Sequence, residues 1–76
     1  MRALLMDKND ESLVTIEVYE ALYDREEGEL CLYGSESIYT VENVSEYEAQ
    51  IFIKMLFESG KVDLARYPAY CMEYDE

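Results

Sequence analysis

The side chains that most often carry out chemistry in proteins are largely missing from this sequence. It contains no histidine, which removes the commonest general base, the serine and cysteine triads, and most zinc and iron sites. No G-x-S-x-G, P-loop or G-x-G-x-x-G segment occurs, and three isolated glycines cannot form a phosphate-binding loop. We therefore expect no catalytic residue, no metal ligand and no cofactor, and we do not expect the chain to be an enzyme.

Two cysteines and one acidic segment remain as candidates for a specific site. Cys31 and Cys71 lie far apart in the sequence, which is not a zinc-binding pattern, and we expect both to be small core residues with free thiols. Their spacing neither requires nor excludes a disulfide. The segment 7–11 resembles the opening of a calcium-binding loop. Its sixth position, however, is Ser12 instead of glycine, and its twelfth is Val18 instead of glutamate.

The sequence is unusual mainly for its negative charge. Eighteen acidic residues stand against six basic ones, which gives a formal net charge of −12 at pH 7. Free nucleic acid and anionic membranes are therefore improbable partners, because both repel such a chain. A basic protein surface or a metal ion remains as a partner, unless the acids serve only to keep the protein soluble.

The acids gather around one predicted hairpin, interleaved with tyrosines that could supply rigid contact area. We predict a partner-binding surface of six acids and three tyrosines: Glu17, Asp24, Glu26, Glu27, Glu29, Glu36, Tyr19, Tyr23 and Tyr33. The alternative is that these tyrosines only cover an exposed face of a sheet.

Several elements must position this surface. We expect a first strand over residues 2–6 and a second over residues 13–23, with a bulge or strand end near Glu20. Residues 24–29 are predicted to form a hairpin loop, with Gly28 in the left-handed conformation. Residues 30–41 then form either one bent strand or two short ones.

The helix is predicted over residues 45–59. Ser45 precedes Glu48 by three residues, as in a capping box, and Gly60 stands where a helix commonly ends. Pro68 excludes a long helix in the segment 62–74, so we expect a short helical turn or an edge strand there.

These elements predict a single α+β domain over residues 1–76, with an antiparallel sheet of three to four strands and one helix packed on a face. The apolar arc of the helix, centred on Phe52, is broad enough to need a second covering layer. The C-terminal segment or a second copy of the chain could supply this layer, so homodimerisation stays open. No stretch reaches transmembrane length and no signal-peptide pattern is present, so we expect a cytoplasmic protein.

A short, acidic chain of antiparallel strands followed by a capped helix resembles the small phage-encoded inhibitors that mimic DNA. Anti-CRISPR proteins, anti-restriction proteins and uracil-DNA glycosylase inhibitors are of this type. The resemblance lies in composition and layout and includes no sequence motif, so no residue role is transferred. It implies that the acids occupy the cationic nucleic-acid site of a defence nuclease or repair enzyme in a bacterial host. The alternative is a non-mimic interaction module, such as an antitoxin, immunity protein or accessory subunit, that associates through its apolar helix face.

Overall fold

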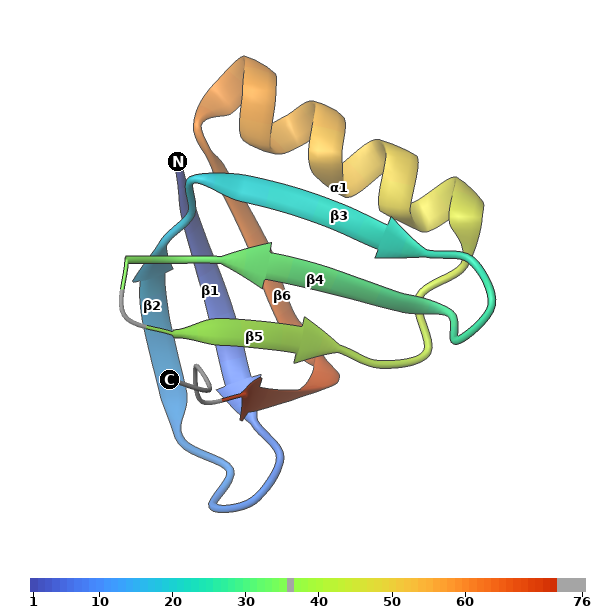
Figure 1. Ribbon diagram of the computed structural model, residues 1–76. Coiled ribbons are helices and arrows are strands. Elements are labelled where there is room, and N and C mark those ends of the chain that lie inside the picture. The colour runs from blue at the N-terminus through green and yellow to red at the C-terminus, as the bar shows by residue number, and fades with distance from the viewer. Residues whose placement is uncertain (36, 73–76) are drawn as a thin grey trace.

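Six β-strands and one α-helix form the computed structural model, which describes residues 1–35 and 37–72 (Figure 1). The elements are β1 (Arg2–Asp7), β2 (Leu13–Glu17), β3 (Glu20–Asp24), β4 (Glu29–Tyr33), β5 (Ile38–Val41), α1 (Glu46–Ser59) and β6 (Lys61–Met72). The strands form one sheet in the order β2-β1-β6-β5-β4-β3, in which β1 and β6 are parallel and all other neighbours antiparallel. The α+β class is confirmed. The expected antiparallel sheet of three to four strands is wrong, because the sheet is mixed and has six strands.

The largest departure from the sequence-based expectation is β6, which lies inside the sheet between β1 and β5. We expected an edge strand or a helical turn over 62–74, because Pro68 cannot donate a ladder hydrogen bond. The structure accommodates Pro68 beside a shift of register. Leu4 pairs with Asp63, whereas Met6 pairs with Pro68, so β6 bulges between these two positions.

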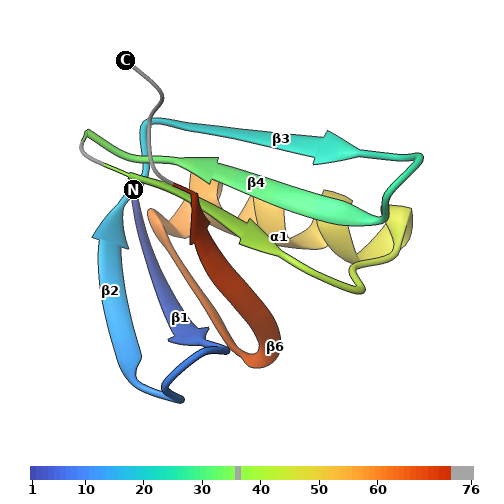
Figure 2. The same ribbon diagram turned by 60° about the horizontal axis from the view of Figure 1, so that its bottom comes forward.

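This bulge bends the sheet into two arms. The first half of β6 continues the arm formed by β1 and β2, and its second half pairs with β5 in the arm formed by β3, β4 and β5 (Figure 2). Helix α1 lies alongside β3 and contacts β6 (Figure 1). The core lies between the arms and the helix, and its largest fully buried side chains include Leu5, Leu30, Leu32, Leu56 and Leu64.

The chain passes from one arm to the other where a single strand was predicted over 13–23. The N–H of the buried Val18 still donates to the carbonyl of Met1 at 2.6 Å, beside β1, whereas the N–H of Tyr19 donates to the carbonyl of Tyr33 at 2.8 Å, on β4. The chain therefore changes its pairing partner between these two residues. Glu20 begins a new strand, β3, which agrees with the expected strand end near it. Of the two alternatives for residues 30–41, one bent strand or two short ones, the structure shows two short strands, β4 and β5.

The predicted helix is confirmed, with both of its end signals. The side chain of Ser45 accepts a hydrogen bond from the N–H of Glu48 at 3.1 Å, and the carboxylate of Glu48 accepts one from the N–H of Ser45 at 3.2 Å. Gly60 ends the helix in the left-handed conformation, with its N–H donating to the carbonyl of Leu56 at 3.0 Å. Over the described residues, the helix is too short and too polar to cross a membrane.

The two cysteines do not form a disulfide. Cys31 lies on β4 and Cys71 on β6, with β5 between them. Strands two places apart in a sheet are separated by about 9.6 Å, whereas a disulfide needs Cα atoms within about 7 Å. Both thiols are free, as expected. The expectation of a core position is wrong for Cys71, which is exposed, and holds only in part for Cys31, which is half-buried.

Candidate functional site

Carboxylates lie all over the described surface, and most of them have no basic partner. Fourteen of the 18 acidic residues fall within the described ranges, and none of these is buried. Four ion pairs join basic side chains to carboxylates: Arg2 to Glu17 (3.0 Å), Lys8 to Glu42 (2.6 Å), Arg25 to Glu46 (2.6 Å) and Lys54 to Glu58 (3.9 Å). Within residues 1–35 and 37–72, ten carboxylates therefore face no lysine or arginine closely enough for an ion pair.

The loop between β3 and β4 carries several of these carboxylates on a backbone that is fixed by hydrogen bonds. Asp24 accepts hydrogen bonds at one carboxylate oxygen from the N–H groups of Glu26 (3.0 Å) and Glu27 (3.2 Å). The N–H of Gly28 donates to the carbonyl of Asp24 at 2.9 Å, and Gly28 has a φ of 67°, as predicted. The side chains of Glu26 and Glu27 are therefore exposed on a turn whose backbone is closed by hydrogen bonds.

This hairpin loop docks against the segment that leads into α1. The carbonyl of Gly28 accepts from the N–H of Val44 at 3.0 Å, and the hydroxyl of Tyr23 donates to the carbonyl of Val44 at 2.6 Å. Arg25 reaches across to Glu46 in the first turn of the helix. The hairpin loop and the start of the helix therefore form one end of the molecule.

We call this region the acidic end; it consists of Asp24, Glu26, Glu27, Glu29, Glu42, Glu46 and Glu48. Acids in the first turn of a helix are stabilised by the positive end of the helix dipole, which allows them to gather there. The hairpin alone would present four of these carboxylates, and its docking to the start of α1 brings the other three close to them.

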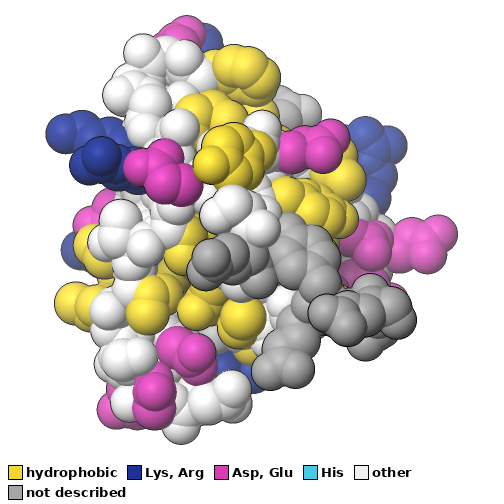
Figure 3. Space-filling model, turned by 60° about the vertical axis from the view of Figure 1, so that its left-hand side comes forward, with side chains coloured by type: hydrophobic (Ala, Val, Ile, Leu, Met, Phe, Trp, Pro, Cys, Tyr) yellow, Lys and Arg dark blue, Asp and Glu magenta, His cyan; other side chains and the backbone are white. Residues whose placement is uncertain are grey.

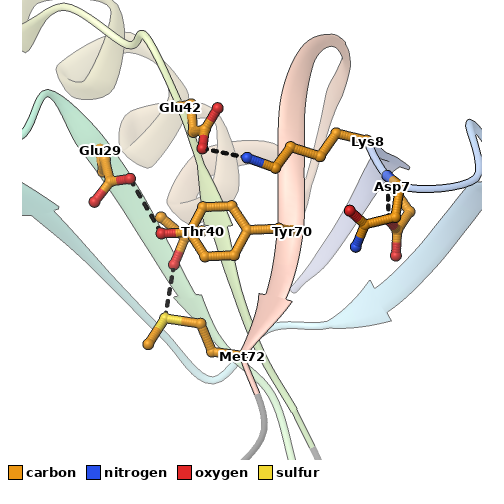
Figure 4. A network of polar contacts seen from close by, with 8 residues as sticks. Asp7, Lys8, Glu29, Thr40, Glu42, Tyr70 and Met72 are labelled. Carbon is orange, nitrogen blue, oxygen red and sulfur yellow. Dashed lines mark hydrogen bonds and ion pairs between the residues drawn. The ribbon is translucent and has the colours of Figure 1, made fainter.

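A polar network fixes two members of the acidic end (Figure 4). The ammonium of Lys8 lies 2.6 Å from the carboxylate of Glu42 and 4.7 Å from the centre of the Tyr70 ring. The hydroxyl of Tyr70 donates to Glu29 at 3.2 Å. The hydrogen bond to Glu42 raises the pKa of Lys8, and burial is the first cause of a raised pKa at Tyr70. Lys8 and Tyr70 thus connect Glu42 on one strand end to Glu29 on another.

A second contact attaches the start of α1 to the bulge of β6. The hydroxyl of Tyr67 donates to the carboxylate of Glu48, and its ring packs edge-on against Phe52 with centroids 5.4 Å apart. This hydrogen bond is the main cause of a lowered pKa at Glu48 and of a raised pKa at Tyr67. The C-terminal segment therefore covers one flank of the helix, which is one of the two alternatives that the sequence left open for the second layer.

The structure brings together only part of the predicted binding surface. The four acids of the hairpin lie together, but Glu17 is on the other arm, where it pairs with Arg2. Tyr19 is 69% exposed where the chain passes between the two arms, and Tyr33 is half-buried on β4. Tyr23 is not free to bind a partner, because its hydroxyl donates to the carbonyl of Val44. Glu36 lies outside the described residues.

Sequence reasoning missed Glu42, Glu46 and Glu48 as neighbours of the hairpin. The last two were visible as acids in the first turn of a capped helix, but nothing local placed that turn beside the hairpin loop. Glu42 reaches the acidic end because the chain runs from β5 towards α1 at this point. Its partner Lys8 is 34 residues away in the sequence, so no local pattern indicates the contact.

Exposed apolar side chains lie on several parts of the described surface. Figure 3 shows several of them over the side of the molecule that carries β2, with separate acidic and basic side chains between them. Two hollows lie in the described surface. The first, of about 450 Å³, is lined by Arg2, Ala3, Leu4, Thr15, Met55, Ser59, Lys61, Val62 and Asp63. The second, of about 240 Å³, is lined by Met1, Tyr19, Glu20, Ala21, Ile53, Leu56 and Phe57.

Within the described part of the chain, no three histidine, cysteine or acidic side chains are grouped so that they could hold a metal ion. Comparison with known proteins found no family model, no curated protein and no solved structure that matches the chain. The proposals below therefore depend on the geometry and charge of this molecule alone.

Proposed function

We propose that the protein inhibits a nucleic-acid-binding protein by placing its acidic end in the cationic site where nucleic acid would bind. One observation carries this proposal. Seven carboxylates from the hairpin, the β5–α1 segment and the first turns of α1 are held at one end of a chain whose net charge is −12. A cationic groove that accepts phosphates attracts such an arrangement by the same electrostatic force.

The rigidity of the acidic end favours binding. Asp24 closes the hairpin loop through two backbone N–H groups, and Val44 attaches that loop to the start of the helix. Carboxylates carried by a fixed backbone lose less conformational entropy on binding than carboxylates on a disordered tail. The long-range field then speeds association, while close contacts set the lifetime of the complex.

The proposed partner is a basic, nucleic-acid-handling protein, such as a defence nuclease or a repair enzyme in the cytoplasm of a bacterial host. The chain itself does not bind nucleic acid or membranes under this proposal, since both are polyanions or anionic surfaces. It needs no cofactor and performs no reaction. The small phage-encoded inhibitors that mimic DNA act in this way.

One observation favours a second candidate, a non-mimic interaction module. Four large apolar side chains of α1 remain exposed: Tyr47 (74%), Ile51 (40%), Met55 (43%) and Phe57 (78%). Such residues on one helix are typical of a surface that docks another helix or a second copy of the chain. Association through them would tolerate high salt, because it would depend on apolar burial instead of charge.

Capture from a bacterial lysate on the immobilised protein, followed by elution in rising salt, separates the two candidates. The proposal predicts a nucleic-acid-binding protein that elutes at moderate salt and is released by added double-stranded DNA or RNA. The captured protein is then purified, and its binding to labelled nucleic acid is measured by fluorescence anisotropy with and without this chain. If the captured partner resists both salt and nucleic acid, the interaction module replaces the proposed inhibitor.

A further inference from the structure

The outer face of β3, β4, β5 and β6 carries apolar and aromatic side chains. Along β4 the inward residues Leu30 and Leu32 are fully buried, whereas the alternate residues Glu29, Cys31 and Tyr33 point outward and are half-buried. Strand pairing aligns these outward residues in rows across the sheet. One row is Leu22, Cys31, Thr40 and Tyr70, and the next is Glu20, Tyr33, Ile38 and Met72.

This outer face is accessible at its edges. Leu22 is 49% exposed on β3, and Met72 is 45% exposed on β6. Between them, Thr40 is buried and its hydroxyl donates to the sulfur of Met72 at 3.2 Å, so the centre of the face is packed (Figure 4). Aromatic side chains and methionine are enriched at the centre of protein interfaces, and this face carries Tyr33, Tyr70 and Met72.

The acidic end borders this face directly. Asp24 and Glu29 are paired with each other across β3 and β4, one row beyond Leu22 and Cys31. Tyr70 belongs to the apolar row, but its hydroxyl donates to Glu29. The apolar surface and the fixed carboxylates therefore form one continuous region, with the charges along one side.

Lys8 shows how a cation is held at this border. Its ammonium lies 2.6 Å from Glu42 and 4.7 Å from the centre of the Tyr70 ring, so an ion pair and a cation–π contact act together (Figure 4). Lys8 makes its ion pair with Glu42 alone. Asp24 and Glu29 present carboxylates to the same border and make no ion pair with a described basic residue.

We propose that this outer face binds the partner together with the acidic end, and that the partner surface presents arginine or lysine side chains around an apolar side chain. The inference rests on the proposed function and specifies the contact. The carboxylates receive the partner's cations, and the row that contains Leu22 and Tyr70 receives its apolar group. The complex is then held by buried apolar area as well as by charge, which distinguishes it from contact with any polycation.

Two short peptides of equal length and charge test this inference, one alternating arginine with leucine and the other alternating arginine with serine. Binding is followed by the backbone amide signals in two-dimensional NMR. We expect the arginine–leucine peptide to shift the amides of 20–24, 29–33 and 70–72, and to bind about tenfold more tightly than the arginine–serine peptide. The variant Leu22→Gln should lose about this tenfold difference. The matched control Phe57→Gln, on the exposed surface of α1, should keep it.

Two results would overturn the inference, and they differ in what they mean for the proposed function. If both peptides bind equally and Leu22→Gln changes neither, the outer face takes no part, although a purely electrostatic inhibitor survives. If neither peptide binds at low salt, the acidic end does not hold arginine at all, and the proposed function fails as well. Thermal unfolding of Leu22→Gln checks that the variant is folded, as expected for a half-exposed side chain.

Discussion

Gly34 should be irreplaceable because of a close approach between the two arms of the sheet. A Cβ atom at this position would lie 2.9 Å from the carbonyl oxygen of Glu17 and 3.3 Å from that of Ser37. Both oxygens belong to the backbone, so neither can rotate away. Overpacking of this kind costs about 1–3 kcal/mol. For a domain of this size, Gly34→Ala should therefore lower the thermal midpoint by roughly 5–20 °C.

Gly60 provides the control, because its requirement for glycine has a different cause. A Cβ atom there would contact nothing within 4 Å, but φ is 75°, which side chains other than asparagine rarely tolerate. Gly60→Ala should cost about 1 kcal/mol, and Gly60→Asn should recover part of that loss. At Gly34, asparagine should be at least as damaging as alanine, since the clash is with the Cβ atom.

The assay is thermal unfolding followed by circular dichroism, at one protein concentration for all four variants. If Gly34→Ala changed the midpoint by less than about 2 °C, the close approach of the β4–β5 turn to the end of β2 would be wrong. If Gly34→Asn were milder than Gly34→Ala, the cause would be backbone conformation instead of crowding.

Two further predictions concern side chains with perturbed pKa values. Removal of the Tyr67 hydroxyl in Tyr67→Phe should destabilise the protein at neutral pH, because Glu48 loses this hydrogen bond. The control Tyr47→Phe, at an exposed tyrosine on α1, should not. The folded state lowers the pKa of Glu48, so the contribution of Glu48 to the free energy of unfolding is present above its ordinary pKa of 4.5 and is lost as the pH falls through the lowered value. When the free energy of unfolding is measured at decreasing pH, Tyr67→Phe should therefore lose less stability than the parent protein. With a thiol reagent, the exposed Cys71 should react rapidly and the half-buried Cys31 slowly, because burial raises the pKa of the Cys31 thiol. Equal reaction rates would contradict the burial of Cys31.

Local features of the fold could be predicted because their causes are local. The ends of α1 follow from the pairing of Ser45 with Glu48 and from Gly60, and the β3–β4 hairpin follows from the turn that contains Gly28. Each of these signals lies within a few residues of the structure that it specifies.

The order of the strands could not be predicted, because it depends on contacts between distant parts of the chain. The pairing of β1 with β6 brings Arg2 beside Lys61, and no local pattern indicates it. Pro68 lacks an N–H donor, which favours an edge strand over an inner one. The bulge beside Pro68 allows β6 to lie inside the sheet, and local propensity does not reveal that bulge.

The candidate site was predictable to the same extent. Asp24, Glu26 and Glu27 belong to one turn, so the sequence placed them together correctly. Glu17 was separated from them because the chain changes arms between β2 and β3. The inward direction of Tyr23 depends on which face of β3 meets the core, and alternation alone does not say which face that is.

Under the proposed function, the partner recognises the positions of the carboxylates and not only their total charge. Two variants with equal net charge test it: Glu26→Gln with Glu27→Gln in the acidic end, and Glu11→Gln with Glu58→Gln elsewhere on the exposed surface. The measurement is the Kd for the captured nucleic-acid-binding partner at several salt concentrations. We expect binding to be at least about tenfold weaker and less dependent on salt for the first variant, with little change for the second. Equal effects of the two variants would contradict it, because the acids would then act only through net charge.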